Sequence, residues 1–376
     1  MNSRFRATIV GVAFLVTIFD VAQGDVLPIA LLRRAQDIQD ESAIGIAGAS
    51  GRRDEIDKRL EASLHASPQG WTDRRILVGL ASFLLTGGNP ALAQRAISLA
   101  PREGADMSLV EQALAYVSGE LPRAGKQLET TNLRMTSPEV AGALALVQAR
   151  LMMEHDRRIA SEKLLAARIL APGGLIEEAA LRRELFILDN ETDPNAIRRI
   201  VGRYFSRFGR SAHVENFVER LETLTEQGWI SRSPEWRSKA SGILEEAPVA
   251  IRRRLALRLA RASLMKGDRN AARQALDIAC ADSIANADLE ERCALYRRID
   301  KITEGAPADD KKTPWQSSPT PGDEEQLLLQ CAKFVRAQLE KAREEDSSNV
   351  AHPETEPMKR VKESMAAADR LIAGFR

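Results

Sequence analysis

The chain of 376 residues is poor in the residue types that build metal, redox and hydrolytic sites. It contains 4 histidines and 3 cysteines, and none of them has the spacing of a CxxC pair, an HExxH helix or a Cys/His zinc cluster. The G-x-S-x-G turn of serine hydrolases is also missing. We therefore predict a protein that is not an enzyme, with no catalytic residues, no cofactor and no bound metal.

Two local patterns come close to catalytic motifs without meeting their requirements. The stretch from Gly119 to Lys126 has five residues, instead of the four of a P-loop, between its glycines, and Gln127 stands where a P-loop has Ser or Thr. Glu177 and Glu178 are adjacent carboxylates, but they open a predicted helix, where the helix dipole favours acidic side chains. We expect these two glutamates to be solvated.

An excess of charge of one sign is missing, as are long apolar runs after the N-terminus. The chain has 54 Lys and Arg against 53 Asp and Glu, whereas nucleic-acid-binding proteins carry a basic footprint. No stretch beyond the first 24 residues reaches the roughly 20 apolar residues of a membrane span. We expect no nucleic-acid partner and no stable membrane span after processing.

Residues 1–24 have the layout of a secretory signal peptide. Two arginines, Arg4 and Arg6, precede an apolar run over residues 7–19, and small residues flank a cleavage site between Gly24 and Asp25. The alternative is an uncleaved membrane anchor, because Asp20 interrupts the approach to that site. We predict an exported protein that begins near Asp25.

An exported chain with three cysteines holds at most one internal disulfide. Cys280 and Cys293 flank a short predicted connection between helices, so they could face each other, whereas Cys331 lies beyond a predicted linker. The alternative is that all three are small buried residues.

Helical periodicity repeats along the chain, and strand-like alternation between hairpin turns is absent. Matching segments begin at Gly88, Gly119, His155 and Gly267. Five residues later each has a small residue, namely Ala93, Ala124, Ala160 and Ala272. Nine residues later stand Ile97, Leu128, Leu164 and Leu276, and twelve residues later Ala100, Thr131, Ala167 and Ala279. These offsets share one helix face. A degenerate copy begins near Thr192, with Ile197, Val201 and Tyr204 at the same offsets.

An amphipathic helix is predicted before each copy, over residues 75–85, 108–117, 139–153, 175–188 and 251–266. Helix, turn and helix in units of about 34 residues resemble the tetratricopeptide repeat. The first-helix positions depart from that pattern at Ala81, Gln112, Gln148 and Leu185, where the repeat prefers a small residue. We predict an all-α fold of degenerate tetratricopeptide-like hairpins, an α-solenoid, over residues 25–304. The alternative is an ordinary helical domain with chance similarity between hairpins.

The two ends of the chain are predicted to differ from the repeats. Residues 26–39 form an amphipathic helix that could cap the first hairpin. Residues 305–324 are rich in Pro and charge and are predicted to be a disordered linker. The C-terminal segment, residues 325–376, is predicted to contain two helices, over 325–345 and 358–375.

One stripe of arginines is a candidate for partner binding. Arg254, Arg258 and Arg261 are spaced i, i+4, i+7 and therefore lie on one helix face. They could form a solvated face paired with Glu245 or Glu246. They could instead bind an acidic segment of a partner, because helical solenoids bind through extended faces.

Several segments resemble the MotC family of exported motility proteins from flagellated alphaproteobacteria. The most specific is APGGLIEEAALRRE, at residues 171–184. It is accompanied by LRRAQDIQD at 32–40, ALAYVSG at 113–119, RYFSRF at 203–208 and the pair Asn216-Phe217. The resemblance covers residues 27–300 approximately and does not extend past Gly305.

The resemblance implies a periplasmic protein that is required for rotation of the flagellar motor. The family acts with MotB, whose periplasmic domain anchors the stator to peptidoglycan, in a chaperone-like or positioning role. It therefore implies the periplasmic domain of the MotB-type stator protein as the partner, and it brings no catalytic residues. A general periplasmic adaptor for another cell-envelope complex is the alternative.

Overall fold

A computed structural model describes residues 28–99, 105–189, 193–231, 234–281, 287–303 and 323–348. Over these ranges the fold is all-helical, with sixteen α-helices, two short 3₁₀ helices and no strand. The predicted signal peptide with its cleavage site at Gly24 and Asp25, residues 305–322 of the predicted linker and the predicted helix 358–375 lie outside the described residues.

Helices α1 to α15 follow one another with short connections. Their bounds are α1 Pro28–Ala43, α2 Ala49–Ala66, α3 Arg74–Leu85, α4 Pro90–Leu99, α5 Ala105–Val117, α6 Leu121–Thr130, α7 Pro138–Met152, α8 Arg157–Leu170, α9 Leu175–Ile187, α10 Pro194–Phe208, α11 Val214–Ser231, α12 Pro234–Glu245, α13 Val249–Met265, α14 Arg269–Ala279, α15 Ala287–Thr303 and α16 Asp323–Ser348. The 3₁₀ helices are Pro68–Thr72 and Leu133–Met135. The five predicted first helices are present as α3, α5, α7, α9 and α13, with nearly the expected bounds.

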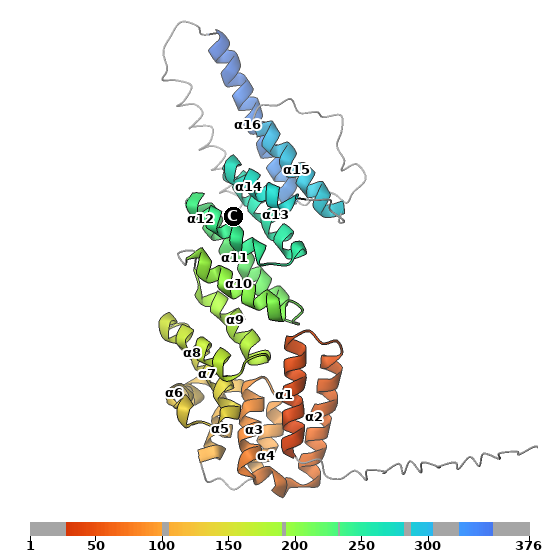
Figure 1. The fold of residues 1–376 in the computed structure, drawn as a ribbon, viewed down its shortest axis with the longest axis vertical. Coiled ribbons are helices and arrows are strands. Elements are labelled where there is room, and N and C mark those ends of the chain that lie inside the picture. The colour runs from red at the N-terminus through yellow and green to blue at the C-terminus, as the bar shows by residue number, and fades with distance from the viewer. Residues whose placement is uncertain are drawn as a thin grey trace, which may run out of the picture.

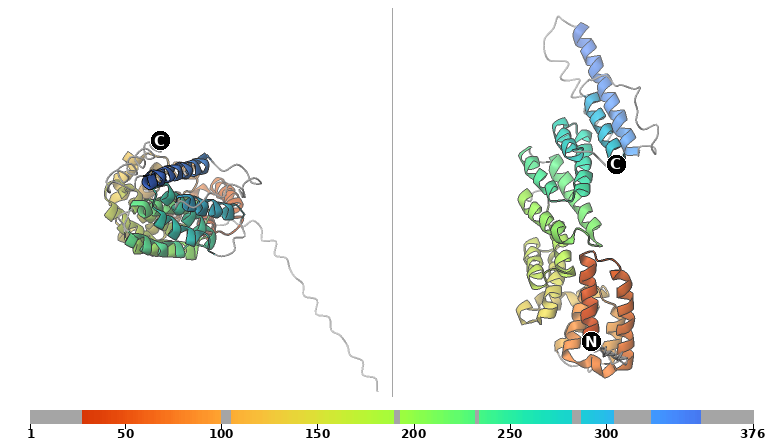
Figure 2. Two further views of the ribbon diagram at one scale, coloured as in Figure 1. Left: turned by 90° about the horizontal axis from the view of Figure 1, so that it is seen from above. Right: turned by 45° about the vertical axis from the view of Figure 1, so that its right-hand side comes forward.

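The helices form an elongated body in which α1 to α8 lie at one end and α15 and α16 at the other (Figure 1). The side view keeps the same order along the long axis (Figure 2). One large core runs from Leu31 to Val147 and a second from Leu181 to Ala332. A small cluster of α7, α8 and α9 residues lies between them. Helix α9 contributes to this cluster and to the second core, so it connects the two halves.

The small residues of the repeated pattern whose side chains the structure describes lie in the core. Ala93, Ala160 and Ala272 are all fully buried, and Leu128, Leu164 and Leu276 are buried on the same faces. Ile97 is only partly buried, and Ala100 lies outside the described residues. The buried faces of α8, α10 and α14 were therefore predicted well, while the side chain of Ala124 lies outside the described residues and the stacking of the hairpins as tetratricopeptide-like repeats stays a prediction.

We expect Ala160→Leu or Ala272→Leu to lower the free energy of unfolding by about 1–3 kcal/mol, because each adds a large side chain to a filled core. Chemical denaturation followed by circular dichroism measures the change. Glu162→Leu, at an exposed position of α8, is the matched control and should change stability by no more than about 0.5 kcal/mol. Equal effects of Ala160→Leu and Glu162→Leu would contradict the repeat alignment.

A departure from the repeat pattern has a structural reason. Gln148 on α7 is fully buried, and its Nε2 donates hydrogen bonds of 2.8 Å to the carbonyl oxygens of Leu128 and Thr131. These carbonyls lie at the C-terminal end of α6, where the last carbonyl groups of a helix lack donors in a following turn, although the Leu128 carbonyl also accepts the backbone N–H of Thr131 at 3.4 Å. A small residue at position 148 would leave them without this partner.

The N-terminal helix, α1, contacts both α3 and α9. Helix α1 packs along α3, where a Cβ on Gly79 would press against Leu32 of α1. Gln39 then donates a hydrogen bond to the carbonyl oxygen of Thr86, at the end of α3. The last turn of α1 also contacts the start of α9.

Candidate functional site

The two adjacent carboxylates of α9 are buried, and the expectation that they are solvated is wrong. Glu177 and Glu178 are each 0% exposed. They open α9 as expected, so the helix dipole does favour them. However, α10 and the turn after it cover the first turn of α9 with groups that neutralise and bind both side chains. Buried carboxylates persist only with such partners.

Glu177 is held between two arginines and a backbone amide. Its Oε1 lies 2.6 Å from Nη2 of Arg203, and its Oε2 lies 3.0 Å from Nη1 of Arg207. The backbone N–H of Gly173 donates to Oε2 at 2.7 Å. Gly173 has a φ of 94°, a left-handed conformation that favours glycine, and this turn directs the amide back toward the carboxylate.

Glu178 is bound by one arginine and two hydroxyl groups. The phenol of Tyr204 donates to its Oε1 at 2.9 Å, and Arg182, one turn later on α9, donates from Nε and Nη2 at 3.3 Å. The Ser211 hydroxyl lies 3.5 Å from the same Oε1. Burial, reinforced by the negative charge of Glu178, raises the pKa of Tyr204. The phenol therefore stays protonated and acts as a donor.

Aromatic stacking extends this contact to α11. The ring of Tyr204 stacks on Phe217 with centroids 3.7 Å apart, and Phe205 meets Phe217 edge-on. Arg182 also donates from Nη1 to Oδ1 of Asn216 at 3.3 Å. The start of α9 is thus tied to both α10 and α11.

Asp40, at the end of α1, binds the N-terminus of α9 from the other side. Its Oδ1 accepts a hydrogen bond of 2.7 Å from the backbone N–H of Leu175, which is one of the unpaired donors of a helix start. A Cβ on Gly174 would collide with this carboxylate, so glycine permits the close approach. Partial burial raises the pKa of Asp40, Asp37 adds to the rise, and the hydrogen bond from Leu175 opposes it.

We call this group the α9 junction; it comprises Asp40, Glu177, Glu178, Arg182, Arg203, Tyr204 and Arg207. It joins the segments 32–40, 171–184, 203–208 and 216–217, which are far apart in the chain and which carry the resemblance described above. The carboxylates of Glu177 and Glu178 are occupied by internal donors and closed to solvent, so they are not placed to exchange protons with an external substrate. The arrangement suits a fixed orientation between the two halves of the molecule.

We expect Asp40→Ala to destabilise the fold by about 1 kcal/mol, the usual cost of losing a helix N-cap. Asp40→Asn should come close to wild type at neutral pH, because its amide oxygen can accept the same hydrogen bond. Urea unfolding of the three proteins measures the difference, and equal stability of all three would contradict a capping role.

The raised pKa of Asp40 also determines the direction in which the stability of the fold changes with pH. The folded state takes up a proton at higher pH than the unfolded state does, so this carboxyl contributes stability as the pH falls through its folded pKa. Wild type should therefore gain stability relative to Asp40→Asn as the pH is lowered from neutral to about 3.9, the pKa of an aspartate in the unfolded chain.

The predicted arginine stripe on α13 lies against acidic residues of α11. Arg254 pairs with Glu215 and Glu222, at 2.8 and 2.9 Å. Arg258 pairs with Glu222 and Glu226, and Arg261 also has a partner. The expected pairing with Glu245 or Glu246 is wrong, because those two side chains face Arg198 of α10. A contact between this stripe and a partner stays a prediction, and a partner would compete with α11.

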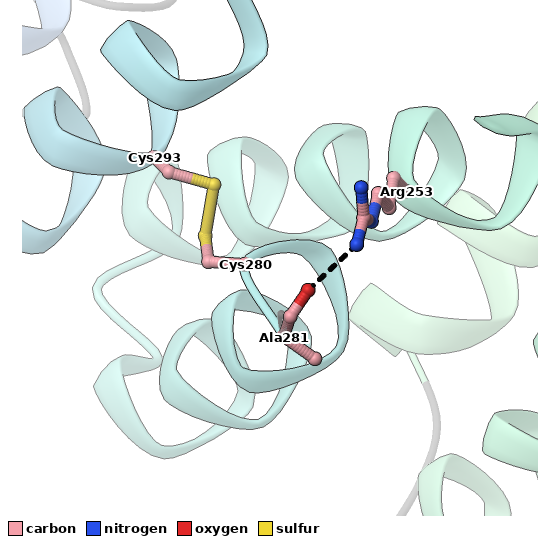
Figure 3. The surroundings of a disulfide bond; sticks show 4 residues. All are labelled: Arg253, Cys280, Ala281 and Cys293. Carbon is pink, nitrogen blue, oxygen red and sulfur yellow. Dashed lines mark hydrogen bonds between the residues drawn. A yellow bond between two sulfur atoms is a disulfide. The ribbon is translucent and has the colours of Figure 1, made fainter. Parts of the chain in front are cut away.

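A disulfide joins Cys280 and Cys293 in the structure, which is the pairing that the sequence allowed (Figure 3). It links the end of α14 to α15, with the Cα atoms 6.0 Å apart. Beside it, Arg253 of α13 donates a hydrogen bond to the carbonyl oxygen of Ala281 (Figure 3). Cys331 on α16 is free and partly buried.

Neither a metal cluster nor a membrane helix occurs in the part of the chain that the structure describes. No group of three or more His, Cys, Asp or Glu side chains there could hold a metal ion. None of the described helices combines the length and the apolar character needed to cross a bilayer. The stretch from Gly119 to Lys126 comprises the end of the turn after α5 and the first residues of α6, so a helix and not a strand precedes it.

Sequence reasoning missed the ion pairs of the α9 junction, although a signal was present. Glu177 and Glu178 stand in the segment 171–184, and Arg203 and Arg207 stand one helical turn apart in the segment 203–208. Their complementary charges and spacing could have suggested the pairing with Glu177.

Comparison with known proteins indicates the same family as the segments that carry the resemblance. A family model described as "Chemotaxis protein MotC" matches residues 1–373. A curated protein of the same name from Rhizobium meliloti (strain 1021) is 28% identical over 272 residues, which cover 69% of this chain and 60% of that protein. The match therefore spans less than two thirds of the length of this relative. No solved structure matches the chain.

Proposed function

Because the chain belongs to the MotC family of chemotaxis proteins, we propose that it is a periplasmic protein required for rotation of the flagellar motor. It binds and supports the periplasmic part of the MotB-type stator protein and catalyses no reaction. The family match over residues 1–373 is the observation that carries this proposal. The degenerate tetratricopeptide-like solenoid is part of it, since such folds present extended surfaces to protein partners.

Three features support a binding role outside the cytoplasm. The signal-peptide pattern of residues 1–24 favours export. The disulfide between Cys280 and Cys293 suits an oxidising compartment. The carboxylates of the α9 junction are used for internal contacts rather than for chemistry, which is consistent with a scaffold.

Deletion of the gene should leave flagella assembled but paralysed, because the stator would lack a protein that supports it. Electron microscopy of filaments and a swimming assay measure the two properties. Complementation with the full chain should restore swimming. The purified mature protein should bind the purified periplasmic part of the stator protein with a Kd of tens of micromolar or tighter, which corresponds to about 6 kcal/mol or more.

Normal swimming of the deletion strain would contradict the proposal, as would the absence of binding in calorimetry at these concentrations. Either result would favour the general periplasmic adaptor, whose partners could be identified by pull-down from envelope extracts.

A further inference from the structure

Helix α10 and the turn after it carry four exposed arginines. Arg199, Arg203 and Arg207 are spaced i, i+4 and i+8 and therefore follow one side of the helix, and Arg210 stands in the turn after it. The helical part of the row, from Arg199 to Arg207, is about 12 Å long at the rise of an α-helix. We call this row the α10 arginine row.

The α10 arginine row keeps an excess of positive charge. Within it only Arg203 and Arg207 have ion pairs in the described part of the chain, and they share the single carboxylate of Glu177. Arg198, which is paired with Glu246, lies one position from Arg199 and points to α12. In the described part of the chain the ion pairs of Glu245 and Glu246 are made to Arg198 and not to the row.

The arginines of α13 provide the contrast. Arg254 and Arg258 face three glutamates of α11 and are neutralised within the chain. The α10 arginine row, which has four guanidinium groups and one carboxylate, is the better site for an external acidic group. Arginine also offers two parallel donors to a carboxylate, which favours binding of acidic side chains.

Two exposed isoleucines lie at the C-terminal end of the row. Ile44 and Ile46, in the loop after α1, are 37% and 45% exposed. Gly45 between them lies so close to Arg210 that a Cβ on it would collide with the Arg210 carbonyl oxygen. The loop therefore holds both isoleucines beside the last arginine of the row.

We propose that the α10 arginine row and the two isoleucines together bind an extended acidic segment of a partner protein, with apolar residues at one end of that segment. The acidic residues would contact the arginines, and the apolar residues would cover Ile44 and Ile46 and remove their surface from water. The inference rests on the proposed function in one respect, since the stator protein is the partner in which we expect such a segment.

The first test uses a charge reversal that spares the α9 junction. Arg199→Glu/Arg210→Glu changes the two arginines of the row for which the described residues provide no ion pair, and it leaves Arg203, Arg207 and Glu177 in place. The probe is a fluorescent synthetic peptide of twelve residues, ten of them Asp or Glu and the last two Leu, measured by anisotropy with the full mature chain. We expect wild type to bind this peptide and the variant to bind it at least about tenfold more weakly, since like charges then face the peptide. The affinity of wild type should fall with added salt.

A matched control carries the same change in net charge elsewhere. Arg33→Glu/Arg95→Glu alters two exposed arginines of α1 and α4, and it should change the affinity by no more than about twofold if the site is local. Ile44→Ser/Ile46→Ser should weaken binding of the peptide that ends in Leu. The same variant should leave unchanged the binding of a peptide that ends in Ser.

Several outcomes would overturn the inference. They are no binding of the peptide to wild type, equal affinity of wild type and Arg199→Glu/Arg210→Glu, and an equal loss in the Arg33→Glu/Arg95→Glu control. Binding to phosphatidylglycerol vesicles in place of the peptide would also overturn it and would indicate a membrane surface instead.

Measuring the binding of the stator domain distinguishes a failure of this inference from a failure of the proposed function. If the peptide behaves as expected and wild type does not bind the stator domain, the surface is supported and the proposed function fails. If the stator domain binds wild type and Arg199→Glu/Arg210→Glu equally, the proposed function stands and the inference fails.

Discussion

Glu178→Ala is expected to lower the free energy of unfolding by about 3 kcal/mol or more, the usual effect of removing one member of a buried charged pair. The carboxylate is fully buried, and it is the acceptor for Tyr204 and Arg182. Without it the phenol of Tyr204 loses its carboxylate acceptor, and Arg182 loses its ion pair and keeps the hydrogen bond to Asn216. Urea denaturation followed by far-UV circular dichroism measures the loss.

Graded substitutions distinguish the charge from the hydrogen bond. Glu178→Gln keeps an acceptor for Tyr204 and removes the charge, so its effect should lie between wild type and Glu178→Ala. Tyr204→Phe keeps the stacking on Phe217 and should cost about 1.5–3 kcal/mol, the net contribution of one hydrogen bond to a charged group.

Glu162→Ala is the control for loss of a glutamate, because its ion pair with Arg158 is exposed and contributes no more than about 0.5 kcal/mol. If Glu178→Ala costs no more than Glu162→Ala, the α9 junction does not stabilise the fold.

Cys293→Ser is expected to lower the free energy of unfolding by about 3 kcal/mol, because a disulfide that closes a short loop restricts the unfolded chain by this amount. The bond spans 13 residues and fixes α15 to the end of α14. Hydrogen exchange should increase first in α15 and α16, which form the far end of the elongated body (Figure 1).

A second contact limits how far α15 separates in this variant. Asp300, near the end of α15, accepts ion pairs from Arg269 and Arg273 of α14, at 3.0 and 2.7 Å. We therefore expect α15 to loosen at its start rather than to detach. Cys331→Ser is the matched control, since Cys331 is free, and it should change stability far less. If reducing agent and Cys293→Ser leave the unfolding curve unchanged, the disulfide does not hold this end.

The helices and their buried faces could be read from the sequence with good accuracy. The predicted helix 175–188 is α9, Leu175–Ile187, and the small residues at positions 160 and 272 are buried as the repeated pattern indicates. This succeeded because helical periodicity is local: the residues that share a face stand three or four positions apart. The sequence also indicated which two of the three cysteines could form a disulfide, because Cys280 and Cys293 stand on either side of one short connection.

The sequence by itself thus determined an all-helical chain, the buried faces of α8, α10 and α14 and the segments that identify its family. Only the tertiary structure decided which charged side chains are internal. Glu177 is expected in water from its place at a helix start, yet it is buried because Arg203 and Arg207 come from α10. Asp40 caps a helix that begins 135 residues later. The free energy of a charged group depends on its neighbours in space and on its distance from water, and neither is encoded in the local period of a helix.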